Sequence, residues 1–158
     1  MNRSASEPEH SSDITIRLAE RADAPVLAEL MGELGYPTRT SEMEMRLQAV
    51  LGDSLYRTIV AVIDGKICGV IGTCSMHSLE HNSQVGRIIG LVVTENQRGR
   101  GAGRALIQAA ETDFLSRNIR RIALTTRLTR EKAHLFYEQL GYVKTGFRFV
   151  KELEGLPD

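Results

Sequence analysis

Three glycines at alternate positions, from Gly99 to Gly103, separate an apolar run from a segment with helical periodicity. The apolar run, at about residues 85–93, is typical of a buried strand. In residues 102–110 alanine and leucine recur at intervals of three and four, which predicts an amphipathic helix. A further apolar run follows at residues 122–125. Because a strand, a helix and a second strand in this order form a parallel, right-handed unit, the chain is constrained to an α/β arrangement here.

The first half of the chain predicts two helices. Residues 26–34 repeat apolar side chains at helical spacing, with Asp23 as the expected N-cap and Pro25 in the first turn. A Gly-Tyr-Pro break follows this segment. Ser41 and Glu44 then form a capping-box pair ahead of the next helical stripe.

Strands are predicted on either side of these helices. Residues 14–18 alternate apolar and polar side chains, as a half-buried strand does. An Asp-Gly turn joins the apolar runs 58–63 and 66–74, which indicates an antiparallel hairpin. After a short helix over residues 133–140, residues 143–151 again predict a strand.

Together these elements predict one α/β (α+β) domain, with a mixed sheet of about six to seven strands and about four helices. We expect the domain to span residues 13–153, with a flexible N-terminal tail at residues 1–12 and a C-terminal tail at residues 154–158. A chain of 158 residues is long enough for one domain of this kind to bury a core.

Charge and composition limit the expected partners. The 20 basic residues balance the 20 acidic ones, so no net field draws the chain to nucleic acid or anionic lipid. The apolar runs are shorter than the roughly 18 residues that span a bilayer, and the first residues lack the apolar core of a secretory signal. Cys68 and Cys74 lack CxxC spacing, and we expect both to be reduced core residues. We therefore expect a cytoplasmic protein without a membrane or nucleic-acid partner.

The glycine turn predicts a binding site for a diphosphate. Its glycines let backbone N–H groups converge, and the helix start adds unpaired N–H groups and the positive end of the helix dipole. Arg98, Arg100 and Arg104 add charge-assisted donors. The turn lacks the Lys-Ser/Thr ending of a P-loop, and the next strand is not followed by an acidic ribose ligand. Nucleoside triphosphates and dinucleotides are therefore less favoured as ligands.

Two segments resemble the GNAT superfamily of N-acetyltransferases. Residues 98–103, RGRGAG, match its pattern of Arg or Gln, two residues, Gly, one residue, and Gly or Ala. Residues 133–142, AHLFYEQLGY, are similar to its segment A-x-x-F-Y-E-x-L-G-F/Y. The predicted element order agrees with the GNAT fold over residues 14–153. The resemblance implies that acetyl-CoA is the cosubstrate and that the loop amides bind its pyrophosphate.

The resemblance also implies which residues bind acetyl-CoA. In the superfamily the strand before the turn is bulged and splays from the next parallel strand, which opens a wedge for the pantetheine arm. Gly90 interrupts this strand, and such a glycine marks a bulge or a close backbone approach, or crowding against the next helix. The implied cofactor-binding residues are Leu91, Val92 and Val93 in the strand and Arg98, Gly99, Arg100, Gly101, Ala102, Gly103 and Arg104 in the turn.

For catalysis the resemblance points to Tyr137, whose hydroxyl would protonate the CoA thiolate that leaves. Helical periodicity alone assigns Tyr137 to the core instead. The attacking amine must lose a proton, but Arg87 stands where several family members place a glutamate for this task. Four other residues could act as the base or could equally be solvated loop residues: His77, Glu80, His81 and Glu95.

The expected reaction is direct acetyl transfer to a primary amine of a small molecule or peptide, without an acyl-enzyme intermediate or a metal. In the superfamily the first two helices and their connection, here residues 34–39, set the acceptor. This connection lacks the acidic cluster that a polycation would require. Three glutamates on the helices could face the acceptor or only solvent, and they are Glu33, Glu42 and Glu44. Related proteins are frequently dimers, which keeps a homodimer among the expected partners.

Several alternatives stay open. The chain could be a protein or peptide acetyltransferase, or a CoA-binding module without catalysis. Arg130 replaces an asparagine that is frequent in relatives, and it is either a surface residue or a ligand of a CoA phosphate. The basic residues near the turn could bind RNA, although few aromatic residues accompany them. Residues 77–81 also spell H-x-x-E-H, the pattern of a zinc hydrolase, which requires a helix.

Overall fold

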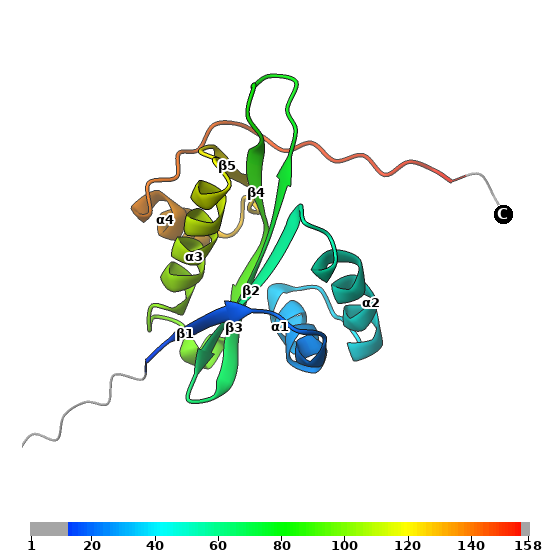
Figure 1. Cartoon of the computed structure of the whole chain (residues 1–158), viewed down its shortest axis with the longest axis vertical. Helices are drawn as coiled ribbons and strands as arrows, with labels where there is room; N and C mark the ends of the chain where they lie inside the picture. The colour runs from blue at the N-terminus through cyan, green and yellow to red at the C-terminus, as the bar shows by residue number, and fades with distance from the viewer. Residues whose placement is uncertain (1–12, 156–158) are drawn as a thin grey trace, which may run out of the picture. The chain divides into compact units, whose positions relative to one another are not determined.

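The computed structural model describes residues 13–155 and divides into two compact units, with the boundary after Ala123. Figure 1 shows its helices and strands. In chain order the elements are β1 (Thr15–Leu18), the 3₁₀ helix η1 (Arg21–Asp23), α1 (Ala24–Leu34), α2 (Thr40–Leu51), β2 (Tyr56–Ile63), β3 (Lys66–Met76), β4 (Val85–Val93), the 3₁₀ helix η2 (Glu95–Gln97), α3 (Ala102–Ser116), β5 (Ile122–Leu124) and α4 (Glu131–Gln139).

The strands form one mixed sheet in the order β1-β2-β3-β4-β5. The pairs β1–β2, β2–β3 and β3–β4 are antiparallel, whereas β4 and β5 are parallel and are joined through α3. The α/β fold with an antiparallel first half and a parallel strand-helix-strand unit is thereby confirmed. The sheet contains five strands in the described residues, fewer than the six to seven that the sequence predicts.

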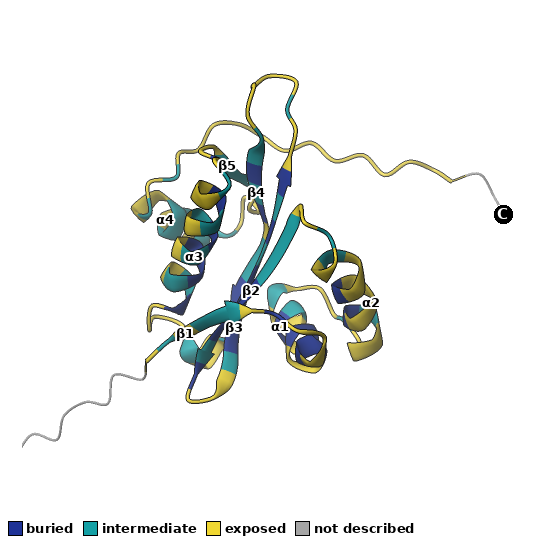
Figure 2. Ribbon diagram, in the orientation of Figure 1, coloured by how far each residue is buried: buried dark blue, intermediate teal, exposed yellow. Residues whose placement is uncertain are grey.

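In the first unit, helices cover both faces of the sheet, with α1 and α2 on one side and α3 on the other (Figure 1). Leu106, Ile107 and Phe114 of α3 are fully buried. Figure 2 shows buried stretches of α3 in dark blue. Because both faces are covered, the central strands have nearly continuous apolar sequences. The buried cluster on the α1 and α2 side joins helix residues to one valine from each of three strands, and it includes Leu27, Leu30, Leu47, Val60, Val70 and Val92.

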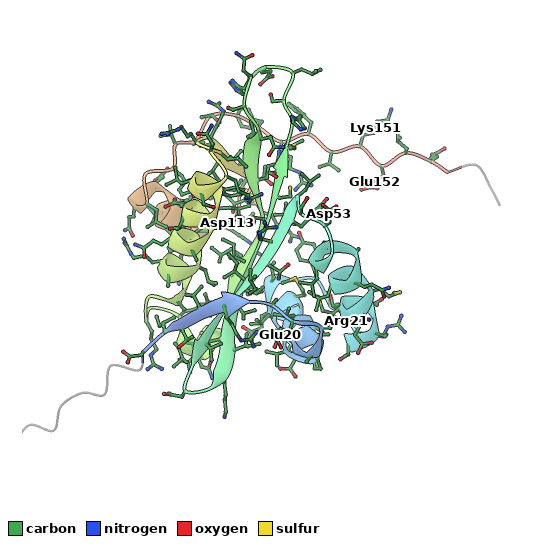
Figure 3. All side chains as sticks on the ribbon, in the orientation of Figure 1. Glu20, Arg21, Asp53, Asp113, Lys151 and Glu152 are labelled. Carbon is green, nitrogen blue, oxygen red and sulfur yellow. The ribbon has the colours of Figure 1, made fainter. Side chains whose placement is uncertain are left out.

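Asp113 of α3 ties this helix to the sheet (Figure 3). Its Oδ2 accepts a hydrogen bond from Arg117 Nη2 at 2.5 Å, and its Oδ1 lies 3.4 Å from Arg57 Nε of β2. Arg117 Nη1 donates to Ser75 Oγ of β3 at 3.2 Å, and its guanidinium lies 5.2 Å from the centre of the Phe114 ring. These contacts fix α3, whose N-terminus follows the glycine turn.

The start of α2 differs from the prediction. The capping box of Ser41 and Glu44 is wrong, because α2 begins at Thr40 and Arg39 is its N-cap. The third helical residue is then Glu42, whose Oε2 accepts the Arg39 N–H at 2.7 Å and whose Oε1 lies 3.3 Å from Arg39 Nη2. The exposed ion pair accompanies this earlier start. The hydrogen bond from the Arg39 backbone N–H, and after it the one from the Arg39 side chain, holds the pKa of Glu42 below its ordinary value.

The predicted strand at residues 143–151 is wrong for this structure, in which residues 141–155 contain no strand. The apolar side chains of this segment are exposed, with Phe149 at 92% and Val143 at 79%. Period-two alternation supplies the side chains of a strand, but a strand also needs a neighbouring strand for its backbone hydrogen bonds. The local sequence pattern does not report whether such a neighbour is present.

Asp23 is the N-cap residue of α1, as predicted, but its side chain does not cap the helix. Its two oxygens accept hydrogen bonds from Arg17 Nη1 at 2.8 Å and Nη2 at 2.9 Å, and Oδ2 also accepts the Glu20 N–H at 2.8 Å. Asp23 is 8% exposed, and the hydrogen bond from Arg17 lowers the pKa of its carboxyl group. This bidentate pair joins β1 to the start of α1.

We expect Asp23→Asn to lower the free energy of unfolding by about 1–3 kcal/mol at pH 7, because it removes charge-assisted hydrogen bonds from a buried group. Since the folded-state pKa of Asp23 is depressed, its contribution is complete above the unfolded value of about 4 and is lost as the pH falls through the folded value. Urea unfolding at pH 7 and pH 3 measures the difference. Glu29→Gln, at an exposed site on α1, is the control. A penalty for Asp23→Asn that is equal at both pH values would contradict this account.

Candidate functional site

The turn between β4 and α3 places backbone donors at the start of a helix. Gly99 has φ +77° and Gly101 has φ +92°, values in the left-handed region that glycine adopts without strain. Gly101 is the N-cap of α3, and the first helical hydrogen bond runs from the Ala105 N–H to the Gly101 carbonyl at 3.0 Å. The N–H groups of residues 101–104 therefore precede every acceptor that the helix itself can offer. Such a helix start attracts an anion.

The three arginines of the turn differ in their surroundings. Arg98 Nε donates to the Val93 carbonyl at 2.9 Å, which folds its side chain back onto the end of β4. Arg100 Nη1 donates to Gln97 Oε1 at 2.6 Å. Arg104 lies exposed in the first turn of α3 and makes no ion pair with the described residues. Arg98 and Arg100 therefore each make a hydrogen bond close to the turn, whereas Arg104 is exposed.

Glu33, in the last helical turn of α1, accepts hydrogen bonds from Thr94 and Glu95, which lead from β4 into the glycine turn. Its Oε1 accepts a hydrogen bond from Thr94 Oγ1 at 2.6 Å, and its Oε2 accepts the Glu95 N–H at 3.0 Å. Arg98 Nη2 lies 3.9 Å from the same Oε2. From the sequence alone, Glu33 is expected either to face the acceptor amine or to lie in solvent. Its partners lie 61 and 62 positions away, so no spacing rule could reveal them.

Strand β4 contains a bulge next to Gly90. Gly72 of β3 pairs with Gly90, and Thr73 pairs with Ile88, which leaves Ile89 without a partner. The bulge that the sequence suggests is confirmed. Crowding is not the reason for the glycine, because a Cβ atom on Gly90 would meet nothing within 4 Å.

The C-terminal end of β4 extends past the end of β5, its parallel neighbour. Gly86 N–H donates to the Arg121 carbonyl at 2.9 Å, immediately before β5 begins at Ile122. Parallel strands advance at the same rate, so the three residues of β5 reach only to about Ile89. Residues 91–93 therefore lie beyond the end of β5. Of these, Leu91 and Val93 direct their backbone groups away from β3, and the Val93 carbonyl accepts the hydrogen bond from Arg98 Nε. Residues 91–93 and the turn both belong to the first unit, and the strand leads into the turn through residues 94–98.

Tyr137 belongs to the second unit, on α4. Its ring makes edge-to-face contacts with Phe136, at 5.3 Å between ring centres, and with Tyr142, at 5.8 Å. Burial raises the pKa of Tyr137, and the charge of Arg130 opposes this shift. The phenol is therefore protonated at neutral pH and can donate a proton. Arg130 itself occupies the N-cap position of α4, where the His134 N–H donates to its carbonyl at 3.1 Å.

The residues proposed as bases do not form a cluster. His77, Glu80 and His81 lie in the connection between β3 and β4, where Gln84 Nε2 lies 3.2 Å from His77 Nε2. This segment is not a helix, so the two histidines lack the geometry of an H-x-x-E-H zinc site. Within residues 13–155 no three His, Cys, Asp or Glu side chains are grouped to hold a metal.

The cysteines are both free, and the expectation of small core residues holds for buried Cys68, whereas Cys74 is only half-buried. Burial raises the pKa of both thiols, which disfavours the thiolate that a nucleophile requires.

A cavity of about 410 Å³ lies beside the beginning of the turn. The three glycines of the turn do not line it, so it is separate from the N–H groups at the start of α3. The cavity lining comes from the β2–β3 hairpin and from η2, and it consists of Ile63, Asp64, Lys66, Ile67, Cys68, Thr94, Asn96 and Gln97.

Of the helices in the described chain, none has the length and apolar character needed to cross a bilayer.

Residues 24–142 match the family model described as the acetyltransferase (GNAT) family. An aminoalkylphosphonate N-acetyltransferase of Salmonella typhimurium is 33% identical over 94 residues, which span 60% of this chain and 61% of that protein. The uncharacterized N-acetyltransferase YhdJ of Bacillus subtilis is 26% identical over 90% of this chain and 97% of its own. The crystal structure of a GNAT family acetyltransferase from Staphylococcus aureus superimposes with a TM-score of 0.76 and 27% identity, over 89% of this chain and 98% of the other.

Proposed function

Because that family model covers residues 24–142, the chain belongs to the GNAT family of acetyltransferases, and we propose that it transfers the acetyl group of acetyl-CoA to the primary amine of a small molecule. The observation that carries the proposal is the pair of left-handed glycines immediately before α3. They support a receptor of main-chain N–H groups for a diphosphate, and CoA contains a diphosphate.

The chain offers donors for each part of acetyl-CoA. The N–H groups at the start of α3 and the Arg104 guanidinium suit the diphosphate. The backbone groups of Leu91 and the N–H of Val93, beyond the end of β5, suit the amide groups of the pantetheine arm. An N–H group of this segment that donates to the thioester carbonyl would stabilise the negative charge that develops there.

In the proposed reaction the neutral amine attacks the thioester carbonyl carbon. A C–N bond forms, the C–S bond breaks, and the nitrogen loses a proton to water. The CoA sulfur leaves as a thiolate, and we assign its protonation to the Tyr137 hydroxyl. The tyrosinate then regains a proton from water, so no net proton is gained or lost. The raised pKa of Tyr137 keeps this hydroxyl protonated until the thiolate forms.

The acceptor is an amine that does not carry several positive charges. The connection between α1 and α2 contains no acidic residue between Gly35 and Arg39, so it offers no counter-charge for a polycation. The similar Salmonella enzyme is named for an aminoalkylphosphonate, an amine that bears an anionic group. We therefore place small amines with one anionic group first among the acceptors to be tested.

The test is release of the CoA thiol from acetyl-CoA in the presence of aminoalkylphosphonates, amino sugars, an aminoglycoside and lysine-containing peptides. We expect amine-dependent release, greatest with a small anionic amine. Release with peptides alone would replace the small-molecule acceptor by a peptide. Binding of CoA by calorimetry with no turnover of any amine would instead support a CoA-binding module.

The glycine turn can be tested by itself with Gly101→Ala. An alanine at φ +92° is strained by about 1–2 kcal/mol, and relief of this strain turns the N–H groups away from the diphosphate. We expect the Kd for CoA to rise about tenfold, the equivalent of one lost hydrogen bond to a charged group. Gly65→Ala is the matched control, because Gly65 has φ +75° in the β2–β3 hairpin and a Cβ there meets nothing within 4 Å. Equal affinities of the two variants for CoA would contradict the proposed receptor.

A further inference from the structure

The carboxylate of Glu33 is engaged on both oxygens by the segment that leads from β4 into the glycine turn. The bond from Thr94 Oγ1 is 2.6 Å long and charge-assisted, and the Glu95 N–H donates to the other oxygen at 3.0 Å. Thr94 is also the N-cap residue of η2, but its hydroxyl does not cap that helix. The hydroxyl is directed to α1 instead.

The position of Glu33 on its own helix is unfavourable. It lies in the last turn of α1, one residue before the helix ends at Leu34. A carboxylate there faces the negative end of the helix dipole, which is unfavourable. The hydrogen bonds to Thr94 and Glu95 offset this cost, so the reason for an acidic residue at this site lies in the contact with the turn.

The segment that Glu33 holds is otherwise bonded mainly to itself. The Arg98 side chain returns to the Val93 carbonyl, and the Gln97 N–H donates to the Thr94 carbonyl at 3.0 Å. On the sheet side, the Thr94 N–H donates to the Cys68 carbonyl at 2.7 Å. Glu33 adds the brace from α1, so β3 and α1 together fix the direction in which the chain leaves β4.

From these contacts we infer that Glu33 is a positioning residue, which orders the turn from Thr94 to Gly101 for binding of the CoA diphosphate. The inference rests on the proposed function. Ordering a loop in its binding conformation before the ligand arrives lowers the entropy cost of binding. Glu33 therefore acts on affinity for CoA through Thr94, Glu95 and Arg98, and it does not take part in the chemical step.

A direct electrostatic role for Glu33 predicts the opposite result. CoA carries several negative charges, so a carboxylate near its receptor repels it, and removing that charge should tighten binding. If Glu33 orders the turn, replacing one of its two acceptor oxygens with an NH₂ donor in Glu33→Gln should weaken binding although repulsion falls. The sign of the change in affinity therefore separates the two roles.

The experiment compares Glu33→Gln with the control Glu29→Gln, which removes the same charge one turn earlier from an exposed site on α1. Thr94→Val is the complementary variant, because it removes the hydroxyl donor and keeps the β-branched shape. Calorimetry measures the Kd of each full-length protein for CoA, and hydrogen exchange measures protection of the amides of residues 94–101. Thiol release gives KM for acetyl-CoA and kcat.

We expect Glu33→Gln to raise the Kd for CoA and the KM for acetyl-CoA about tenfold, to change kcat less than about twofold, and to speed amide exchange in the turn. Thr94→Val should act in the same direction, and the double variant should lose less than the product of the two effects. Glu29→Gln should leave all these quantities unchanged.

An unchanged or lower Kd in Glu33→Gln, with wild-type protein that binds CoA, overturns the inference and leaves the proposed function intact. A wild-type protein that does not bind CoA overturns both. Unfolding of Glu33→Gln at the assay temperature would be seen in circular dichroism. In that case Thr94→Val, which leaves α1 unaltered, decides the question: a higher Kd for CoA supports the inference, and an unchanged or lower Kd overturns it.

Discussion

Tyr137→Phe is expected to lower kcat for acetyl transfer by about 10²–10⁴-fold, the usual contribution of a general acid. The substitution removes only the hydroxyl. The edge-to-face contacts of the ring with Phe136 and Tyr142 do not require that hydroxyl, so the fold and the KM for acetyl-CoA should change little. Thiol release at saturating acetyl-CoA and amine measures the effect.

The pH dependence of the wild-type protein supplies a second measurement of the same assignment. Because burial raises the pKa of Tyr137, the acid form persists to above about pH 10, and no loss of kcat from its deprotonation is expected below that value. Tyr142→Phe, at the neighbouring ring, is the control and should retain kcat within about threefold of wild type. If Tyr137→Phe also retains kcat, the residue is an aromatic packing residue of α4 and the thiolate obtains its proton elsewhere.

Gly86→Ala is expected to lower the free energy of unfolding by about 3 kcal/mol, at the upper end of the usual cost of overpacking. A Cβ atom on Gly86 would lie 2.7, 2.8 and 2.9 Å from Cε1, Cζ and Cδ1 of the Phe114 ring. Phe114 is 0% exposed, and Arg117 lies against its ring, so the ring cannot turn aside without disturbing α3. Urea unfolding measures the loss.

Gly90→Ala is the control for this substitution, since it changes the same strand at a site where a Cβ meets nothing within 4 Å. Its cost should stay below about 1 kcal/mol. Phe114→Leu in the Gly86→Ala background should restore part of the stability, because the smaller side chain leaves room for the new methyl group. Equal stability of Gly86→Ala and wild type would show that the ring is not held as tightly as the structure indicates.

Features that depend on local backbone chemistry were predictable from the sequence. The Asp-Gly hairpin is one, because Asp64 and Gly65 both adopt positive φ values, 50° and 75°, as a tight turn of this type requires. The glycine turn is another, because Gly99 and Gly101 have the left-handed conformations for which the residue type is selected.

Features that depend on distant partners were not predictable. The role of Glu33 arises from contacts with residues 94 and 95, and no periodicity links a helix in the first quarter of the chain to that turn. The error at residues 143–151 has the same origin, since alternation describes one strand and pairing requires a second. The predicted cap of α2 is wrong because the pattern of Ser41 with Glu44 matches a capping box, whereas the observed N-cap, Arg39, is not a typical capping residue. Its backbone N–H bonds to Glu42 and its side chain pairs with the same carboxylate.

The extra residue in β4, Ile89, also changes which face of the sheet the later side chains of the strand point to. Gly86 and Ile88 pair with Ser75 and Thr73, on the face of the sheet that Phe114 covers. Without Ile89 in excess, every second residue after Gly86 would continue on that face, and Val92 would point at α3. With it, Val92 pairs with Val70 and joins the cluster under α1 and α2. One strand therefore packs against both helical layers. Regular pairing of β4 without the bulge would move the side chains that follow Ile89, up to the glycine turn, from the α3 face of the sheet to the α1 and α2 face and the reverse.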